Sequence, residues 1–456
     1  MISEFLATMI AKCCDTQEQQ MQLASAGVIQ PLINLLHSGY IKAQQAALDA
    51  LSTLGRENTI DTNQFTTVTM IEFVKNKSAS MRLVAATCLT NLYRSGVFSE
   101  PFNEIVLTVL PALVKLMKED VDNVQEQAPL VLADLIKDSD DMQKAAYDAD
   151  TIPQLAELLI SVSTKPTEKD DPMGIPGTGS LAKHKESVKE NCLIALAAAT
   201  LLKEECRSQA IEHKILPHVV AALQDEQPRV RLAACQCIKS LSRSVANLRT
   251  SLVDHGVATP LIKLLQDESV LVQSAACAAL CNLVLDFSPM KKTVIEAGAM
   301  NKFIEYARSQ DARLQLNGMW AIKSMVYKAD LALKKSVMDS LTFEGLLGLL
   351  QESQTDVQEQ ALETTRNLVC GQLDDVKYVI EGVGKDELLD ILESKLHVTS
   401  GMGITNEEEP KPKLVEAALY VVVNMCSVPS AEPKDLIMSR PNILNSVIHH
   451  LVSHRK

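Results

Sequence analysis

The stretch "VQSAACAALCNLV", Val272 to Val284, decides the fold of this chain. Counted from Val272, its apolar side chains recur at offsets 0, 3, 4, 7, 8, 11 and 12. This is the spacing of one face of an α-helix. Because these side chains are small or aliphatic, the stretch predicts a helix that packs closely against other helices.

The same pattern recurs at a nearly constant spacing. The best copies begin at Val188, Val230, Val272, Leu314 and Val357, with steps of 42, 42, 42 and 43 residues. Looser copies begin at Ala43, Met81, Val124 and Leu414. An apolar helix and a polar turn precede each copy, and a shorter helix stands before them. A three-helix unit with a period near 42 residues is typical of the armadillo repeat.

The predicted fold class is therefore all-α: an armadillo-repeat superhelical solenoid. We expect residues 1–456 to form a single array of about nine repeats plus a partial tenth. Gly27, Gly256 and Gly298 suit the tight bend between the first two helices of a repeat. The composition agrees, because 46% of residues are hydrophobic but only 4% are aromatic, which argues against a β-sandwich or β-barrel.

Two steps between repeats are too long for the period. The step from Val124 to Val188 is 64 residues, and the step from Val357 to Leu414 is 57. The surplus residues are rich in proline, glycine and charge, which predicts disordered insertions at 163–185, within repeat four, and at 397–413, within repeat nine.

The charge of the chain restricts the classes of partner that it can bind, and its cysteine content indicates the cellular compartment. The net charge of −13 argues against nucleic acid or an anionic membrane as the main partner. The first residues do not resemble a signal peptide, and no apolar run reaches membrane-spanning length. With eleven cysteines, an odd number, the chain is expected in the cytoplasm and nucleus with its thiols reduced.

No motif for catalysis, metal binding or cofactor binding stands out. Cys88, Cys192, Cys237 and Cys426 lie on the apolar stripes of their helices, where a thiol serves as a small hydrophobic side chain. There is no Cys-x-x-Cys pair, no Gly-x-Ser-x-Gly and no His-Glu-x-x-His. We therefore expect no enzyme activity, no metal and no cofactor.

The long third helices of an armadillo superhelix line its concave groove, so their outward positions predict a partner-binding surface. These positions are offsets of about 2, 6, 9, 10 and 13, opposite the apolar stripe. Hydroxyl and amide side chains there can bond a peptide backbone, and cations suit acidic side chains or a C-terminal carboxylate. The predicted groove residues are Lys239, Ser240, Arg243, Asn282, Trp320, Lys323, Ser324, Tyr327, Arg366 and Asn367.

Other interpretations of these residues stay open. Lysine and arginine are common on solvated helix faces, and a single tryptophan can be half-buried packing. The asparagines can instead bond neighbouring helices. Nuclear-import armadillo receptors repeat a Trp-x-x-x-Asn motif to bind basic signals, but here the position paired with Trp320 is Ser324.

Several stretches go beyond the general armadillo pattern. "VRLAACQCIKSLSRSVANLRTS" from Val230, "CNLVLDFSPMKKTVIEAGA" from Cys281, "LNGMWAIKSMVYKA" from Leu316 and "PKDLIMSRPNIL" from Pro433 include turns and helix exits that the fold does not dictate. In sequence, order and spacing they resemble the armadillo repeat-containing protein 8 family. Members of that family extend further at both ends.

The resemblance implies a non-catalytic scaffold of a CTLH (GID-type) RING E3 ubiquitin ligase. Such a subunit bridges the substrate-receptor subunit to the module that holds the LisH-CTLH and RING subunits, and so supports proteasomal degradation. The resemblance further implies that an extended peptide, the receptor's C-terminal tail, docks in the groove. The alternative is a free-standing armadillo cargo or signalling adaptor of import-receptor or catenin type.

Overall fold

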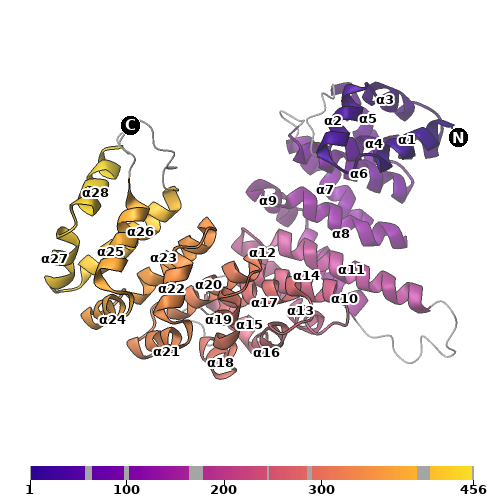
Figure 1. Cartoon of the computed structure of the whole chain (residues 1–456). Coiled ribbons are helices and arrows are strands. Elements are labelled where there is room, and N and C mark those ends of the chain that lie inside the picture. The colour runs from indigo at the N-terminus through magenta and orange to yellow at the C-terminus, as the bar shows by residue number, and fades with distance from the viewer. Residues whose placement is uncertain are drawn as a thin grey trace. The chain divides into compact units, whose positions relative to one another are not determined.

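The computed structural model describes residues 2–56, 64–96, 102–163, 178–243, 246–284, 290–397 and 411–453. Within these ranges the regular elements are all helices, which confirms the all-α armadillo prediction (Figure 1). The contacts divide the chain into two compact units, residues 1–255 and 256–456, called unit 1 and unit 2 below. Each unit is described by itself, and the expected single array across both stays a prediction.

Unit 1 begins with a lone helix and continues in repeats that end in a long third helix. Its helices are α1 (Ile2–Lys12), α2 (Gln17–Ser25), α3 (Ile29–Leu36), α4 (Ile41–Leu54), α5 (Gln64–Val74), α6 (Ala79–Arg94), α7 (Phe102–Leu116), α8 (Asp122–Ile136), α9 (Asp140–Asp148), α10 (Thr151–Ser163), α11 (Thr178–Ala199), α12 (Glu204–Glu212), α13 (Leu216–Ala222), α14 (Pro228–Leu241) and α15 (Ala246–Asp254). The third helices are α4, α6, α8, α11 and α14, and successive ones pack against each other.

Unit 2 repeats the same arrangement. Its helices are α16 (Ala258–Leu264), α17 (Val270–Leu283), α18 (Met290–Glu296), α19 (Ala299–Ala307), α20 (Ala312–Val326), α21 (Leu331–Leu341), α22 (Phe343–Leu350), α23 (Thr355–Leu368), α24 (Leu373–Val383), α25 (Lys385–Leu396), α26 (Pro412–Ser427), α27 (Glu432–Met438) and α28 (Pro441–Ser453). The third helices α17, α20, α23 and α26 pack side by side in that order (Figure 1).

The apolar stripes predicted from the sequence form the core. On α17, Val272, Leu280 and Leu283 are fully buried, as the offsets require. Most cysteines are buried as well, and burial raises the pKa of the Cys237 thiol to about 12 and that of Cys206 to about 11. A thiol that stays protonated at neutral pH is a poor nucleophile, so these residues act as core side chains.

Helices extend into both stretches that the sequence predicts to be insertions. Ser163 ends α10, and residues 178–185 form the first turns of α11, so the helix begins earlier than the predicted insertion allows. In repeat nine, α26 already begins at Pro412. The remaining residues, 164–177 and 398–410, lie outside the described residues.

In six of the third helices, a long polar side chain fastens the helix to the turn before it. At offset 1, Arg82 donates to the carbonyls of Asn76 and Lys77, each at 2.9 Å. Arg231 donates in the same way to the carbonyls of Asp225 and Glu226, also at 2.9 Å. Glutamines at this offset bond the same kind of carbonyl in other repeats: Gln44, Gln125, Gln273 and Gln358. These bonds satisfy carbonyls that a helix end leaves without a partner.

The bend between the first and second helices requires a backbone conformation that favours glycine. The bend residues with positive φ are Gly27, Asp150, Lys214, Gly256, Gly298, Thr342 and Gly384. The three bend glycines predicted from the sequence are thereby confirmed. Where a side chain stands instead, as at Lys214 with φ of 60°, the left-handed conformation carries a steric cost.

Replacing Lys214 with glycine is expected to stabilise unit 1 by about 1 kcal/mol, because the strain is relieved. Lys214 is exposed, so little packing is lost. Urea unfolding followed by circular dichroism measures the change. The matched control is Gly298→Ala, where an added Cβ meets no atom within 4 Å but φ is 72°. It should lose a similar free energy, and destabilisation by Lys214→Gly would contradict the argument.

Candidate partner-binding surface

Four of the side chains at offset 10, on α6, α14, α23 and α26, bond a neighbouring third helix. In unit 1, Ser240 is 2% exposed, donates to the Ala197 carbonyl at 2.8 Å and accepts from the Thr200 hydroxyl at 2.9 Å. In unit 2, Asn367 is 4% exposed and donates to the Lys323 carbonyl at 3.1 Å. The expected outward orientation is therefore wrong for Ser240 and Asn367.

The same bond recurs in other repeats. Asn91 donates to the Ser52 carbonyl at 3.2 Å, and Asn424 donates to the Arg366 carbonyl at 3.0 Å. Each acceptor lies at offset 9 of the preceding third helix. This series of bonds, called the ladder below, joins consecutive repeats and explains why Asn and Ser recur at offset 10.

Two further residues are buried against expectation. Ser324 is 3% exposed and donates to the Trp320 carbonyl of its own helix at 3.0 Å, so it does not supply a ladder bond. Cys281, at offset 9 of its repeat, is 1% exposed. In place of a ladder bond, the N-terminal halves of α17 and α20 are joined by the Asn317 amide, which donates to the Ser274 carbonyl and hydroxyl at 3.2 and 2.8 Å.

The other expected residues lie nearer the surface. In unit 1, Lys239 is half-buried on α14 and Arg243 is exposed in the turn that follows. In unit 2, Asn282 is half-buried near the end of α17, and Tyr327 is half-buried where α20 ends. The ammonium of Lys328 lies 5.5 Å from the centre of the Tyr327 ring.

Unit 2 brings two of the expected cations together with residues that the sequence analysis missed. Lys323 on α20 pairs with Glu363 on α23 at 2.8 Å, and Arg366 lies 3.6 Å from the same carboxylate. The Arg366 guanidinium also lies 5.4 Å from the ring centre of Tyr420 on α26. Lys323, Glu363, Arg366 and Tyr420 are called the Arg366 cluster below.

The cluster follows a sequence signal that was available. Glu363 and Tyr420 stand at offset 6 of their repeats, the offset that Trp320 occupies one repeat earlier. Offset 6 therefore presents an aromatic ring, a carboxylate and a second ring on three consecutive third helices. Trp320 is half-buried and Tyr420 is 45% exposed, so both rings reach the surface in part.

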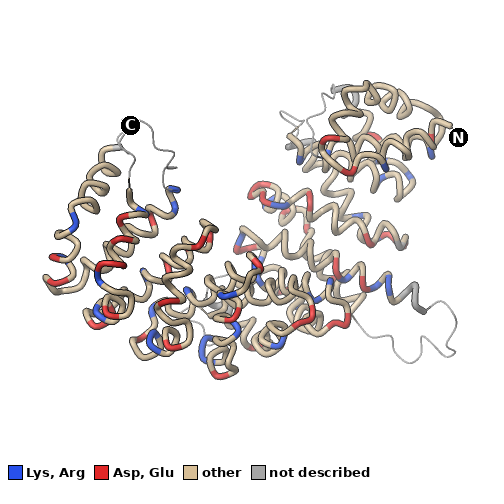
Figure 2. Tube along the Cα trace, viewed as in Figure 1, with Lys and Arg blue, Asp and Glu red and all other residues tan. Residues whose placement is uncertain are grey.

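The Arg366 cluster is less basic than the predicted groove cations alone would make it. The charges of Lys323, Arg366 and Glu363 sum to +1, since one carboxylate is shared by two cations. Basic and acidic residues are interspersed along the helices of unit 2 (Figure 2). A partner group that bonds Arg366 would thus compete with Glu363, which favours a carboxylate held in a defined geometry.

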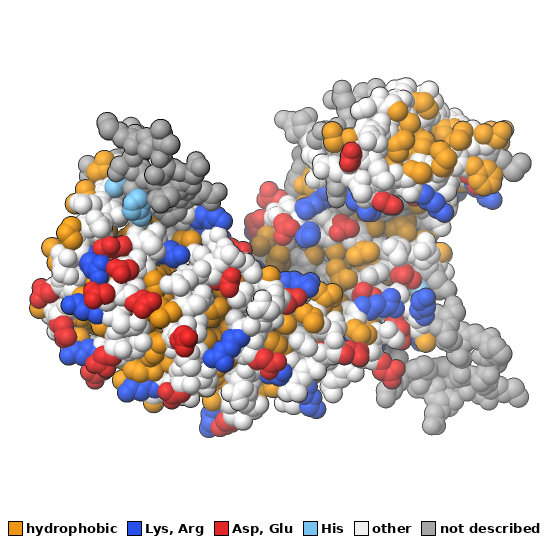
Figure 3. All heavy atoms as spheres, in the orientation of Figure 1, with side chains coloured by type: hydrophobic (Ala, Val, Ile, Leu, Met, Phe, Trp, Pro, Cys, Tyr) orange, Lys and Arg blue, Asp and Glu red, His pale blue; other side chains and the backbone are white. Residues whose placement is uncertain are grey.

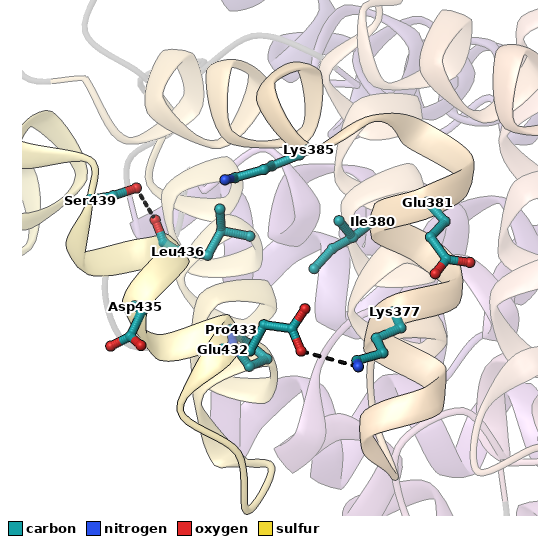
Figure 4. A pocket seen from close by; sticks show the side chains of 9 residues that line it. All are labelled: Lys377, Ile380, Glu381, Lys385, Glu432, Pro433, Asp435, Leu436 and Ser439. Atoms are coloured by element: carbon teal, nitrogen blue, oxygen red, sulfur yellow. Dashed lines mark hydrogen bonds and ion pairs between the residues drawn. The ribbon is translucent and has the colours of Figure 1, made fainter.

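The described residues offer few features of a metal site, a membrane span or a ligand cavity. In those ranges no group of three or more His, Cys, Asp and Glu residues could hold a metal ion. None of the described helices is both long and apolar enough to cross a bilayer. A cavity of 530 Å³ in unit 2 lies between α24 and α27, where Lys377 pairs with Glu432 at 3.1 Å and Ile380, Pro433 and Leu436 complete part of the lining (Figure 4). Its lining mixes both charges.

Comparison with family models identifies repeats and one longer domain. Residues 16–56 and 247–285 match the armadillo/beta-catenin-like repeat, and residues 215–245 match the HEAT repeat. Residues 301–456 match the VID28/GID5 C-terminal domain, a range that contains the Arg366 cluster.

Curated relatives extend the match over almost the whole chain. Armadillo repeat-containing protein 8 of Danio rerio is 29% identical over 460 residues, which cover 98% of this chain and 66% of that protein. The chain is similar to armadillo repeat-containing protein 8 over nearly all of its length. GID complex subunit 5 of Schizosaccharomyces pombe is 31% identical over 383 residues, covering 81% of this chain and 46% of its own. The resemblance to the armadillo repeat-containing protein 8 family is thus confirmed.

The chain spans about two thirds of the Danio rerio armadillo repeat-containing protein 8 and less than half of the yeast subunit. Among solved structures, an engineered protein covers 93% of this chain and 95% of its own, with a TM-score of 0.62 and 19% identity. At that identity the likeness supports the fold alone.

Proposed function

We propose that the chain is the armadillo subunit of a GID/CTLH-type RING E3 ubiquitin ligase. In this role it bridges a substrate-receptor subunit to the LisH-CTLH and RING subunits, and has no catalytic activity of its own. The match of residues 301–456 to the VID28/GID5 C-terminal domain carries the proposal. The relatives named for armadillo repeat-containing protein 8 and for GID complex subunit 5 support it.

The proposed mechanism is geometric. A scaffold that holds a receptor and a ubiquitin-charged partner together raises their effective concentration, so ubiquitin transfer needs no chemistry from the scaffold. Buried, protonated thiols such as Cys237 agree with this role. The proposed place of action is the cytoplasm and nucleus.

We further propose that an extended peptide or C-terminal tail of the receptor docks on the partly exposed third-helix face. Of the expected residues, Lys239, Arg243, Asn282, Trp320, Lys323, Tyr327 and Arg366 remain candidates for contact. Ser240 and Asn367 would act indirectly, by holding neighbouring third helices together, whereas Ser324 bonds the Trp320 carbonyl of its own helix. In unit 2 the Arg366 cluster offers a guanidinium beside an aromatic ring, which suits a carboxylate next to an apolar side chain.

The test is affinity purification of the tagged chain from its own cells. The wild type is compared with Lys323→Gln/Arg366→Gln, which removes both cations without placing new carboxylates beside Glu363. The matched control is Lys292→Gln/Lys434→Gln, which removes two exposed cations elsewhere in unit 2. Thermal unfolding of all three proteins shows whether the folds are equally stable.

We expect the wild type and the control to recover RING subunits and a receptor. The cluster variant should recover the RING subunits but lose most of the receptor. Retention of the receptor by the cluster variant would leave the scaffold in place and contradict the docking site. A wild type that recovers no ligase subunit would contradict membership of the complex and favour a free-standing adaptor.

A further inference from the structure

A second cavity, in unit 1, has a net positive lining and an exposed apolar side chain. It measures 480 Å³ and lies between the end of α5, the start of α6 and the helix α7. Cavities of about 300–1,000 Å³ are the usual size for ligand sites. The residues that matter for recognition are Val74, Lys75, Leu107, Pro111, Ala112 and Lys115.

The apolar part of the cavity is open to solvent. Leu107 on α7 is 77% exposed, although it is a large aliphatic side chain in a folded unit. Pro111 stands one helical turn further along the same face, and Val74 at the end of α5 is 2% exposed and closes the base. Hydrophobic side chains also gather at the α1 end of unit 1 (Figure 3), but α1 does not line this cavity.

Arg82 builds the wall of the cavity. Its guanidinium donates to the carbonyls of Asn76 and Lys77 at 2.9 Å each and pairs with the Glu119 carboxylate on the far side. The turn that follows α5 is thereby fixed against the end of α7. The Glu119 carboxylate pairs with Arg82, and the charges of these two residues cancel. The positive charges of the two lysines at the rim therefore remain.

Those two lysines, Lys75 and Lys115, give the cavity its net positive charge. Lys75 and Lys115 are both exposed, and neither ammonium has an ion-pair partner within the described residues. The lining therefore carries two uncompensated positive charges in a chain whose net charge is −13. This contrasts with the cavity of Figure 4, where Glu381, Glu432 and Asp435 oppose two lysines.

We propose that this cavity binds an acidic peptide segment of a partner protein, with one large apolar side chain seated against Leu107. Charge complementarity and the apolar base select the occupant, since the flanking carboxylates would meet Lys75 and Lys115. A hollow that takes one side chain fits a peptide better than the flat surface of a membrane. The site is separate from the third-helix face and does not depend on the proposed ligase role.

The test uses fluorescein-labelled peptides of twelve residues, rich in glutamate, with a single central Leu, Phe or Ala. Fluorescence anisotropy measures their binding to the whole chain. We expect the Leu and Phe peptides to bind about tenfold more tightly than the Ala peptide, and their affinity to fall as salt is raised. Lys75→Gln/Lys115→Gln and Leu107→Asp should each weaken them by about tenfold.

The matched control is Lys12→Gln/Lys42→Gln, which removes two exposed lysines of unit 1 outside the cavity. It should bind like the wild type, and circular dichroism should show that every variant is folded. Equal binding of the Leu and Ala peptides, an equal loss in the control, or no binding up to about 1 mM would overturn the proposal. Binding of phosphatidylserine vesicles without binding of the peptides would overturn it in favour of a membrane surface.

Discussion

Replacing Asp375 with alanine is expected to destabilise unit 2 by about 3–5 kcal/mol. The carboxylate of Asp375, on α24, accepts from the Lys334 ammonium on α21 at 2.8 Å, and the two residues are 6% and 1% exposed. Its second oxygen accepts from the backbone N–H of Gln372 at 2.7 Å. Without the carboxylate, the buried ammonium keeps, within the described residues, only the Cys370 carbonyl at 2.6 Å as a hydrogen-bond partner. An uncompensated buried charge costs more free energy than a lost surface ion pair.

Urea unfolding followed by tryptophan fluorescence measures this effect, because Trp320 is the single tryptophan of the chain and lies in unit 2. The control is Lys334→Met/Asp375→Leu, which replaces both charges with apolar side chains of similar size. It should recover much of the lost stability, since neither charge is left buried alone. A loss below about 1 kcal/mol for Asp375→Ala would show that water or backbone groups satisfy the ammonium.

The fold was predictable because its signal is repeated. A single apolar stripe such as Val272 to Val284 is ambiguous, but nine copies, five of them separated by steps of 42 or 43 residues, specify one repeating unit. The bend glycines were predictable for the same reason. Lys214 and Thr342 were not, because those bends adopt positive φ without the residue that normally signals it.

The partner-binding surface was harder to predict because a third helix in a solenoid has neighbours on two sides. Its partners cover more of its circumference than the apolar stripe alone indicates, so polar residues at offset 10 are buried or half-buried. Ser240 and Asn367 therefore serve the ladder instead of facing solvent. The Arg366 cluster depends on contacts between repeats, and Glu363 and Tyr420 become significant only when their helices are placed side by side.

Replacing Gly318 with alanine is expected to destabilise unit 2 by about 3 kcal/mol or more. Gly318 lies on the core stripe of α20, where the helix packs directly against the backbone of α19. An added Cβ would lie 2.5 Å from the Ala307 amide nitrogen, 2.7 Å from the Phe303 carbonyl oxygen and 2.8 Å from the Tyr306 Cβ. Two of these atoms are backbone, so α19 and α20 must move apart to accept the methyl group.

Gly348→Ala, in helix α22 of the same unit, is the matched control because its added Cβ meets no atom within 4 Å. That change should stabilise unit 2 by about 0.5–1 kcal/mol, since alanine has the higher helix propensity. Trp320 fluorescence, two residues from Gly318, reports on both variants in urea. The same chemical substitution should thus have opposite signs at the two positions. Similar effects at both would mean that helix propensity, and not the close approach of α19 to α20, determines the cost at Gly318.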